Sequence, residues 1–514
     1  MVNRRYSWHA AAGAMGFCLM QSVCAALPEQ DDLVSLSQQM QQGKQTAVGL
    51  LDRYTQRIQR QNPALYAVIA MNPEARSQAQ TADQKKSHRS PLHGIPVLIK
   101  DNIDAAGMPT TAGSLALAEN VATADAPLVA RLRAAGVVIA GKTNLSEWAN
   151  FRSTTATSGW SSVGGQVRNP YATDRSPCGS SSGSGAAVAA RLIPAAIGTE
   201  TDGSIVCPAA VNGLVGVKPT LGLVSRSGIV PLSHSQDTAG PMTLTVRDAA
   251  LLLNVMAGSD PADVATRDAD RLRTYDYTMG LSKTGLQGKR LGVVRKLVDS
   301  YDAETKAVFE RALKTLKSRG AVIVDQVELA YLDELEKDEL TVLLYEFKAD
   351  LNTYLEHAPA SVQTRSMEQV IAYNKQYADK LMPYFGQELM EQAQATGDLN
   401  TPEYREASAR LKQRAGTEGI DATLKKYQLD ALIAPTTGTA WAIDYKAGDV
   451  IEGSASSPAA IAGYPHVTVP MGLSKQLPVG LSFFAEAWSD AKLLKLAYAY
   501  EQARPALPAP KIAK

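Results

Sequence analysis

Residues 176–220 read SPCGSSSGSGAAVAARLIPAAIGTETDGSIVCPAAVNGLVGVKPT, and this stretch decides how the rest of the chain is interpreted. It begins with a glycine- and serine-rich loop, continues into a helix of small residues and ends in a second glycine- and serine-rich turn. Glycine lets a backbone approach other groups closely, and few purely structural segments need this composition. The stretch therefore predicts a functional site built on two loops.

Apolar runs of the kind that form buried strands alternate with stretches of helical periodicity along the chain. The strand-like runs are 95–99, 137–140, 291–294, 321–327, 432–434 and 467–469, and the helical stretches are 33–58, 126–135, 303–318 and 331–426. Thr46 stands where it could cap the second of two helices within 33–58. This alternation predicts an α/β fold.

The length and composition of the chain indicate its domain organisation. With 514 residues and a hydrophobic content of 45%, the chain can bury a large core. Its sequence contains no internal repeat, low-complexity linker or abrupt change of composition that would mark a boundary. We therefore expect one large domain.

The first residues have the features of a secretory signal peptide. Arg4 and Arg5 precede an apolar stretch, 8–20, that is too short to span a bilayer, and the small Val23 and Ala25 suit a cleavage site. We expect residues 1–26 to be removed, residues 27–514 to form the mature domain, and the protein to be periplasmic or secreted. A buried first helix is the alternative. The arginine pair leaves both the general and the twin-arginine export routes open.

Charge and cysteine content argue against several kinds of partner. The formal net charge is +1 and no basic run contains interleaved aromatic residues, so we expect no nucleic-acid partner. We also expect no stable membrane insertion once the leader is removed. Cys178 and Cys207 are the cysteines left after cleavage, and the sequence leaves open whether they are free or paired. No cysteine or histidine spacing suggests a metal, so we expect neither metal nor cofactor. The oligomeric state stays open.

Further motifs accompany the glycine- and serine-rich stretch over nearly the whole mature chain. They are GIPVLIK at 94–100, GKTNLSEWAN at 141–150, DTAGPM at 237–242, AGYPHVTVPMG at 462–472 and LPVGLSFF at 477–484. Together these motifs resemble the amidase signature family. Within that family, SPCGSSSGS, GTETDGSIVCPAA and YEFKADLNTYL at 345–355 are most similar to bacterial peptide amidases, which remove C-terminal amides from peptides.

The resemblance implies a fold and a set of site residues. The expected fold is a single large domain in which helices surround a central mixed, twisted β-sheet. In the family a lysine acts as base, one serine follows a cis peptide bond and relays the proton, and a second serine is the nucleophile. The implied residues are Lys100, Ser180 and Ser204 in those roles, Thr201, Asp202 and Gly203 as backbone donors of an oxyanion hole, and Ser181 as a supporting residue.

The chemistry of amide hydrolysis explains why these residue types belong together. A serine hydroxyl is a weak nucleophile near neutral pH and needs an adjacent base. Lysine can be that base only when it is neutral, whereas a solvated lysine has a pKa of roughly 10.4. Apolar neighbours such as Ile99 would lower the pKa of Lys100. The expected activity is hydrolysis of a small-molecule or peptide carboxamide through an acyl-enzyme on Ser204.

Two other motifs suggest different functions. Residues 136–143, GVVIAGKT, match the P-loop expression, but the apolar middle would be a strand with Lys142 at its end, so nucleotide binding is disfavoured. Residues 179–183, GSSSG, fit the nucleophile elbow of an α/β-hydrolase esterase with Ser181 at its centre. The candidate bases for that esterase are His234, His357 and His466.

The esterase alternative would leave the turn around Ser204 and the strand that ends at Lys100 as coincidences. A further alternative is the glutaminase subunit of a tRNA-dependent amidotransferase, which shares the catalytic core of the family. That enzyme works in the cytosol, so the leader argues against it. The sequence does not identify the physiological amide.

Overall fold

A mixed β-sheet of 11 strands lies at the centre of residues 31–514. The computed structural model describes residues 31–85 and 89–512, so the predicted leader, 1–26, lies outside the described residues. In spatial order the strands are β1 (Val68–Met71), β3 (Val138–Thr143), β2 (Pro96–Lys100), β6 (Ala195–Glu200), β8 (Thr238–Thr243), β7 (Val215–Lys218), β12 (His466–Ser474), β13 (Leu477–Phe484), β11 (Ala431–Pro435), β9 (Arg290–Val293) and β10 (Val322–Val324). The predicted single α/β domain with a mixed sheet is confirmed.

The direction of the strands changes across the sheet. Strands β3, β2 and β6 are parallel at one side, β11, β9 and β10 are parallel at the other, and the strands between them pair antiparallel. Every residue of β2, β3 and β6 is buried, as expected of parallel strands that are covered on both faces. Because β2 and β6 are parallel neighbours, Lys100 and Glu200, the last residues of these strands, lie at the same edge of the sheet.

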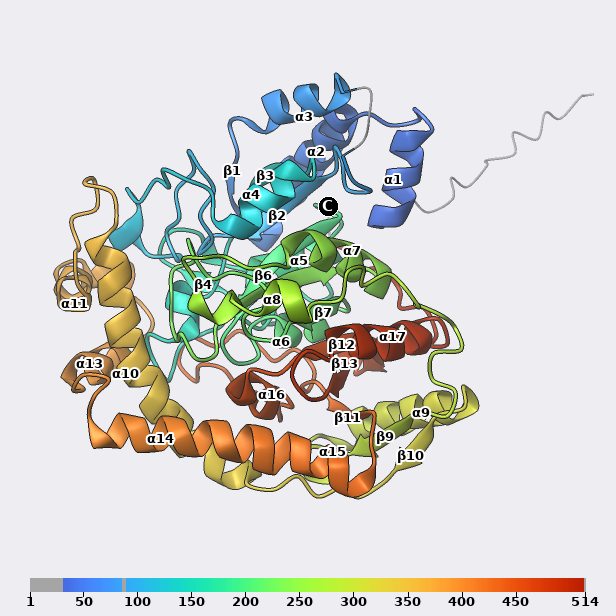
Figure 1. Cartoon of the computed structure of the whole chain (residues 1–514). Helices are drawn as coiled ribbons and strands as arrows, with labels where there is room; N and C mark the ends of the chain where they lie inside the picture. Colours follow the sequence, from blue (N-terminus) through green and yellow to red (C-terminus); the bar gives the residue numbers. More distant parts are fainter. Residues whose placement is uncertain (1–30, 86–88, 513–514) are drawn as a thin grey trace, which may run out of the picture. The chain divides into compact units, whose positions relative to one another are not determined.

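Helices cover the sheet, and a group of them between β10 and β11 forms a layer of its own (Figure 1). The α-helices are α1 (Leu33–Gln41), α2 (Ala47–Leu65), α3 (Ala75–Asp83), α4 (Pro127–Ala134), α5 (Ser182–Ala189), α6 (Val206–Val211), α7 (Val246–Met256), α8 (Ala269–Leu272), α9 (Ala303–Ser318), α10 (Leu335–Glu356), α11 (Met367–Gln376), α12 (Ala378–Leu381), α13 (Glu388–Ala395), α14 (Pro402–Lys412), α15 (Ala422–Tyr427), α16 (Ser457–Ala462) and α17 (Asp490–Glu501). A π-helical turn, Gln413–Asp421, joins α14 to α15.

Most of the predicted elements are present, with different ends. Thr46 caps α2 as predicted, since its Oγ1 accepts a hydrogen bond from the amide of Gly49 at 3.0 Å. The predicted helical stretch 331–426 is divided into the helices from α10 to α15, and α10 packs against both α13 and α14 (Figure 1). In the part of the chain that the structure describes, no helix is long and apolar enough to cross a membrane.

The P-loop-like motif at 136–143 is a strand, as its apolar middle predicted. Strand β3 includes Lys142, whose buried Nζ donates hydrogen bonds to the carbonyl oxygens of Ile103 at 2.7 Å and Pro109 at 2.9 Å. The same ammonium lies 3.4 Å from Oδ1 of Asp101. Lys142 therefore holds the segment that follows β2, and the motif has no exposed loop of amides for a phosphate.

Candidate active site

Lys100 ends strand β2 and is completely buried. Its Nζ donates hydrogen bonds to Oγ of Ser180 at 2.7 Å and to Oγ1 of Thr199 at 2.8 Å. Burial lowers the pKa of Lys100 to about 7, although the nearby carboxylates of Asp237 and Glu200 act in the opposite direction. The lysine is therefore largely neutral at pH values just above 7, in the form that can accept a proton.

The glycine- and serine-rich loop before α5 places Ser180 against this lysine. The peptide bond between Gly179 and Ser180 is cis, as the family resemblance implied. The next residue, Ser181, is completely buried, and its Oγ donates to the carbonyl oxygen of Thr199 at 3.0 Å and accepts from the Thr199 amide at 3.2 Å. Ser181 therefore joins the loop to strand β6.

The second predicted turn, residues 201–204, lies on the wall of a pocket of about 330 Å³. Thr201, Asp202, Gly203 and Ser204 all line this pocket, together with Gly179 from the first loop. The backbone of Gly203 has φ of +77°, a left-handed conformation that favours glycine, and the Ser204 carbonyl accepts a hydrogen bond from the Ser181 amide at 3.1 Å. The two loops therefore meet at the pocket.

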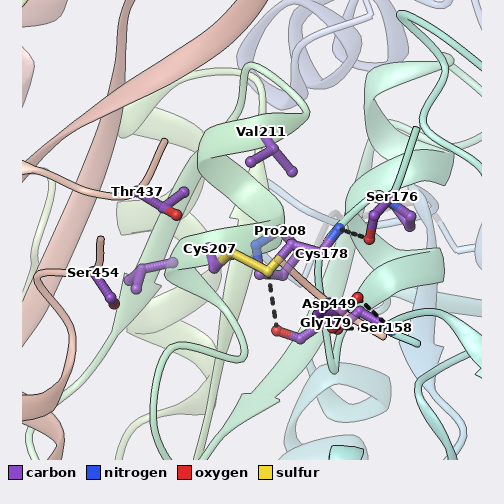
Figure 2. The surroundings of a disulfide bond; sticks show 12 residues. Ser158, Ser176, Cys178, Gly179, Cys207, Pro208, Val211, Thr437, Asp449 and Ser454 are labelled. Carbon is purple, nitrogen blue, oxygen red and sulfur yellow. Dashed lines mark hydrogen bonds between the residues drawn. A yellow bond between two sulfur atoms is a disulfide. The ribbon is translucent and has the colours of Figure 1, made fainter. Parts of the chain in front are cut away.

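A disulfide bond connects the same two loops, which settles the pairing that the sequence left open. Cys178 precedes the cis peptide bond and Cys207 lies in α6 just after Ser204, and their Cα atoms are 6.1 Å apart (Figure 2). Both cysteines line the pocket beside Ser204. The Cys178 amide also donates to Oγ of Ser176 at 3.1 Å. The wall of the pocket is thus covalently cross-linked at the site.

The rest of the pocket wall is partly apolar and partly acidic. Apolar side chains come from distant parts of the chain: Phe151, Leu232, Leu343 and Ile451. Glu339 of α10 lines the pocket together with the turn, and burial and the neighbouring Asp202 raise its pKa well above the ordinary value. A substrate in this pocket would therefore meet both apolar surface and hydrogen-bonding groups.

The histidines of the esterase alternative lie in other surroundings. His466 is buried and bonds through Nε2 to Oγ of Ser482 at 2.6 Å, while Nδ1 of His357 contacts the carbonyl oxygen of Thr353 at 2.8 Å. Nδ1 of His234 lies 2.9 Å from Oδ2 of Asp350. Since Ser181 is instead bonded to Thr199, the esterase alternative is not supported by this geometry.

One group of residues has ligand atoms close enough for a metal ion. Among residues 31–85 and 89–512, this group is His234, Glu346 and Asp350, whose ligand atoms lie within 4.8 Å of one another. In the structure these side chains contact each other, with His234 between the two carboxylates. Their contacts account for the cluster without a metal.

Several residues that complete the site could not be assigned from the sequence. Thr199 binds Lys100, Asp237 accepts a hydrogen bond from the Thr201 hydroxyl at 2.5 Å, and Gln236 donates to the Thr201 carbonyl at 3.3 Å. Asp237 begins the DTAGPM motif, and Thr199 stands inside the GTETDGS stretch. Both motifs belong to the family resemblance, but the sequence assigns no role to these individual side chains.

Comparisons with known proteins give a consistent result over most of the chain. The family model described as Amidase matches residues 49–494. The structure of the native peptide amidase from Stenotrophomonas maltophilia is 49% identical, with a TM-score of 0.89 over 94% of this chain and 99% of that chain. A probable amidase of Arabidopsis thaliana is 39% identical and covers 89% of this chain and 87% of its own length. A glutamyl-tRNA(Gln) amidotransferase subunit of Symbiobacterium thermophilum is 34% identical and covers 90% and 96%.

Proposed function

This chain belongs to the amidase signature family and is an amide-hydrolysing enzyme, and on that premise we propose that it removes C-terminal amides from peptides through an acyl-enzyme on Ser204. The observation that carries the mechanism is the 2.7 Å contact of Lys100 Nζ with Ser180 Oγ, next to the pocket that Ser204 lines. The low pKa of Lys100, about 7, supports its role as base.

In the proposed reaction, Ser204 Oγ attacks the amide carbonyl carbon and its proton passes to Ser180, while the proton of Ser180 passes to neutral Lys100. The tetrahedral intermediate collapses when the carbon–nitrogen bond breaks, and the departing nitrogen takes a proton back through Ser180. Ammonia leaves and an ester on Ser204 remains. Water then attacks the ester through the same relay, so the acid is released and Ser204 regains its proton.

The negative charge that develops on the substrate oxygen needs donors that are already aimed at it. The backbone amides of Thr201, Asp202 and Gly203 are the proposed donors, and each such donor is worth roughly 3 kcal/mol in related hydrolases. Support comes from the left-handed Gly203 and from the position of this turn on the pocket wall. Ser181, which bonds to Thr199, has the proposed role of holding the first loop in place.

Peptide amides are the proposed substrates because two observations favour them. The pocket combines apolar side chains such as Phe151 and Leu343 with the acidic pair of Asp202 and Glu339, which can accept hydrogen bonds from peptide N–H groups. The identity of 49% to a peptide amidase exceeds the 34% identity to the amidotransferase subunit, which is the alternative function. The proposal therefore predicts activity on amidated dipeptides and weak activity on glutamine.

We also propose that residues 1–26 direct export to the periplasm or the medium. The Cys178–Cys207 disulfide supports this proposal, because such bonds persist mainly in oxidising compartments. N-terminal sequencing of the protein recovered outside the cytoplasm tests it. A mature chain that starts at Ala26 or Leu27 is expected, and an intact leader on a cytoplasmic protein would contradict export.

The deciding experiment measures ammonia release from an amidated dipeptide, an aryl amide and glutamine. Ser204→Ala and Lys100→Ala are expected to abolish release, whereas Ser181→Ala lowers it. Ser457→Ala is the matched control, because Ser457 also lines the pocket but lies on α16. Full activity in Ser204→Ala would refute the nucleophile, and a preference for glutamine would favour the amidotransferase alternative.

A further inference from the structure

Glu346 is a completely buried carboxylate on α10 that binds a loop from another part of the chain. Its Oε2 accepts hydrogen bonds from both the amide of Ser235, at 3.1 Å, and the Ser235 hydroxyl, at 2.8 Å. The hydroxyl of Ser233 also donates to Oε2. The other oxygen, Oε1, accepts from the Tyr404 hydroxyl of α14 at 2.7 Å and lies 3.3 Å from Nε2 of His234.

The loop that Glu346 binds, residues 232–237, holds the first residue of the proposed oxyanion turn. Asp237 receives hydrogen bonds at Oδ2 from the amides of Leu232 at 2.8 Å and Ser233 at 2.9 Å, and at Oδ1 from the hydroxyl of Thr201 at 2.5 Å. Gln236 donates from Nε2 to the Thr201 carbonyl at 3.3 Å. Thr201 is therefore held at both its side chain and its backbone by this one loop.

We propose that Glu346 is a positioning residue for amide hydrolysis, which acts through the 232–237 loop on Thr201 and so fixes the backbone of the turn that ends at Ser204. This inference rests on the proposed function, in which that turn binds the oxyanion. Glu346 does not touch the substrate pocket wall and has no catalytic contact of its own; Oε2 acts by holding Ser233 and Ser235.

The chemistry of the site explains why such a remote group matters. Donors that stabilise a developing oxyanion work only if they are fixed before the reaction, and a displacement of about 1 Å can cost roughly 100-fold in rate. A completely buried carboxylate that accepts three hydrogen bonds at one oxygen is a rigid anchor. Asp350 strengthens it, because its carboxylate accepts from the amide of His234 at 2.8 Å, within the same loop.

The two oxygens of Glu346 allow a test that separates positioning from simple stability. Glu346→Leu removes both sets of contacts, and Glu346→Gln keeps one oxygen that can accept from the serines. Tyr404→Phe removes only a contact on Oε1. Glu336→Gln, at an exposed position on the same helix, is the matched control. For each variant, kcat and KM on an amidated dipeptide are measured together with the melting temperature.

We expect kcat of Glu346→Leu to fall by between about tenfold and 100-fold with a smaller change in KM, and Glu346→Gln to recover part of it. Ser235→Ala is expected to lower kcat less, and the double variant with Glu346→Leu no further than Glu346→Leu alone, because the bonds share one acceptor. Wild-type kcat in Glu346→Leu, or an equal loss in Tyr404→Phe, would overturn the inference. Ser204→Ala, run alongside, tests the proposed function separately: if it keeps full activity, the proposed function itself fails.

Discussion

Replacing Cys178 and Cys207 together with serine is expected to lower the free energy of unfolding by about 3.6 kcal/mol. The two cysteines are separated by 29 residues in the sequence. For a loop of that size, the chain-entropy relation gives a loss of about 12 cal/mol/K in the unfolded state, which corresponds to about 3.6 kcal/mol at 25 °C. Removing the cross-link returns that entropy to the unfolded chain and so destabilises the native protein.

The same substitution is also expected to lower kcat. Cys178 stands just before Ser180 and Cys207 just after Ser204, so the bridge fixes the distance between the loops that carry the two serines (Figure 2). The Lys100–Ser180 contact does not depend on the bridge, since it joins β2 to the first loop alone. We therefore expect a severalfold loss of kcat and an unchanged pH dependence.

Thermal inactivation is the suitable assay, because chains of this length often unfold irreversibly and their stability is then a rate. The half-life at a fixed temperature and the release of ammonia are measured for wild type and for the double variant, each with and without dithiothreitol. Reductant should shorten the half-life of the wild type and leave the variant unchanged. Equal half-lives of the two proteins, together with no effect of reductant on the wild type, would refute the reasoning.

Three further predictions concern other parts of the site. Because the pKa of Lys100 is lowered to about 7, kcat/KM should fall by about tenfold per pH unit below that value and level off above it, as a pH–rate profile would show. Arg152→Met should lower the free energy of unfolding by about 3–5 kcal/mol, because it leaves Glu147 buried without its 2.6 Å partner, whereas the exposed Arg175→Met should change denaturant unfolding little. Ser181→Ala should destabilise by roughly 1–3 kcal/mol in the same assay, since both its hydrogen bonds to Thr199 are lost.

The arrangement of Lys100, Ser180 and Ser204 could be predicted because their surroundings are local. The apolar run before Lys100 indicates a strand buried on both faces, and that strand, β2, is the parallel neighbour of β6, which leads into the turn of Ser204. The glycine- and serine-rich wording on either side of α5 indicates the two loops. Short motifs with fixed spacing were therefore enough to locate these residues.

Contacts between distant segments could not be predicted. Ser233 and Glu346 are 113 residues apart, and an acidic residue on a helix is ordinarily placed on the exposed face, yet Glu346 is completely buried. The pairing of Cys178 with Cys207 depends on a Cα separation of 6.1 Å that only the folded chain provides. Helical periodicity over 331–426 indicated the helices but not which of their acids would face inward.

The burial of Lys100 also determines which reagents can reach the enzyme. A lysine with a pKa of about 7 would ordinarily be the most reactive amine of a protein toward aldehydes and activated esters, because much of it is unprotonated near neutral pH. Lys100 is completely buried, however, and the wall of the pocket beside Ser204 contains no lysine among the described residues. Electrophiles that enter the pocket would therefore label the hydroxyl of Ser204 and leave the amine intact, so inhibitors for this enzyme should be built on serine-directed groups.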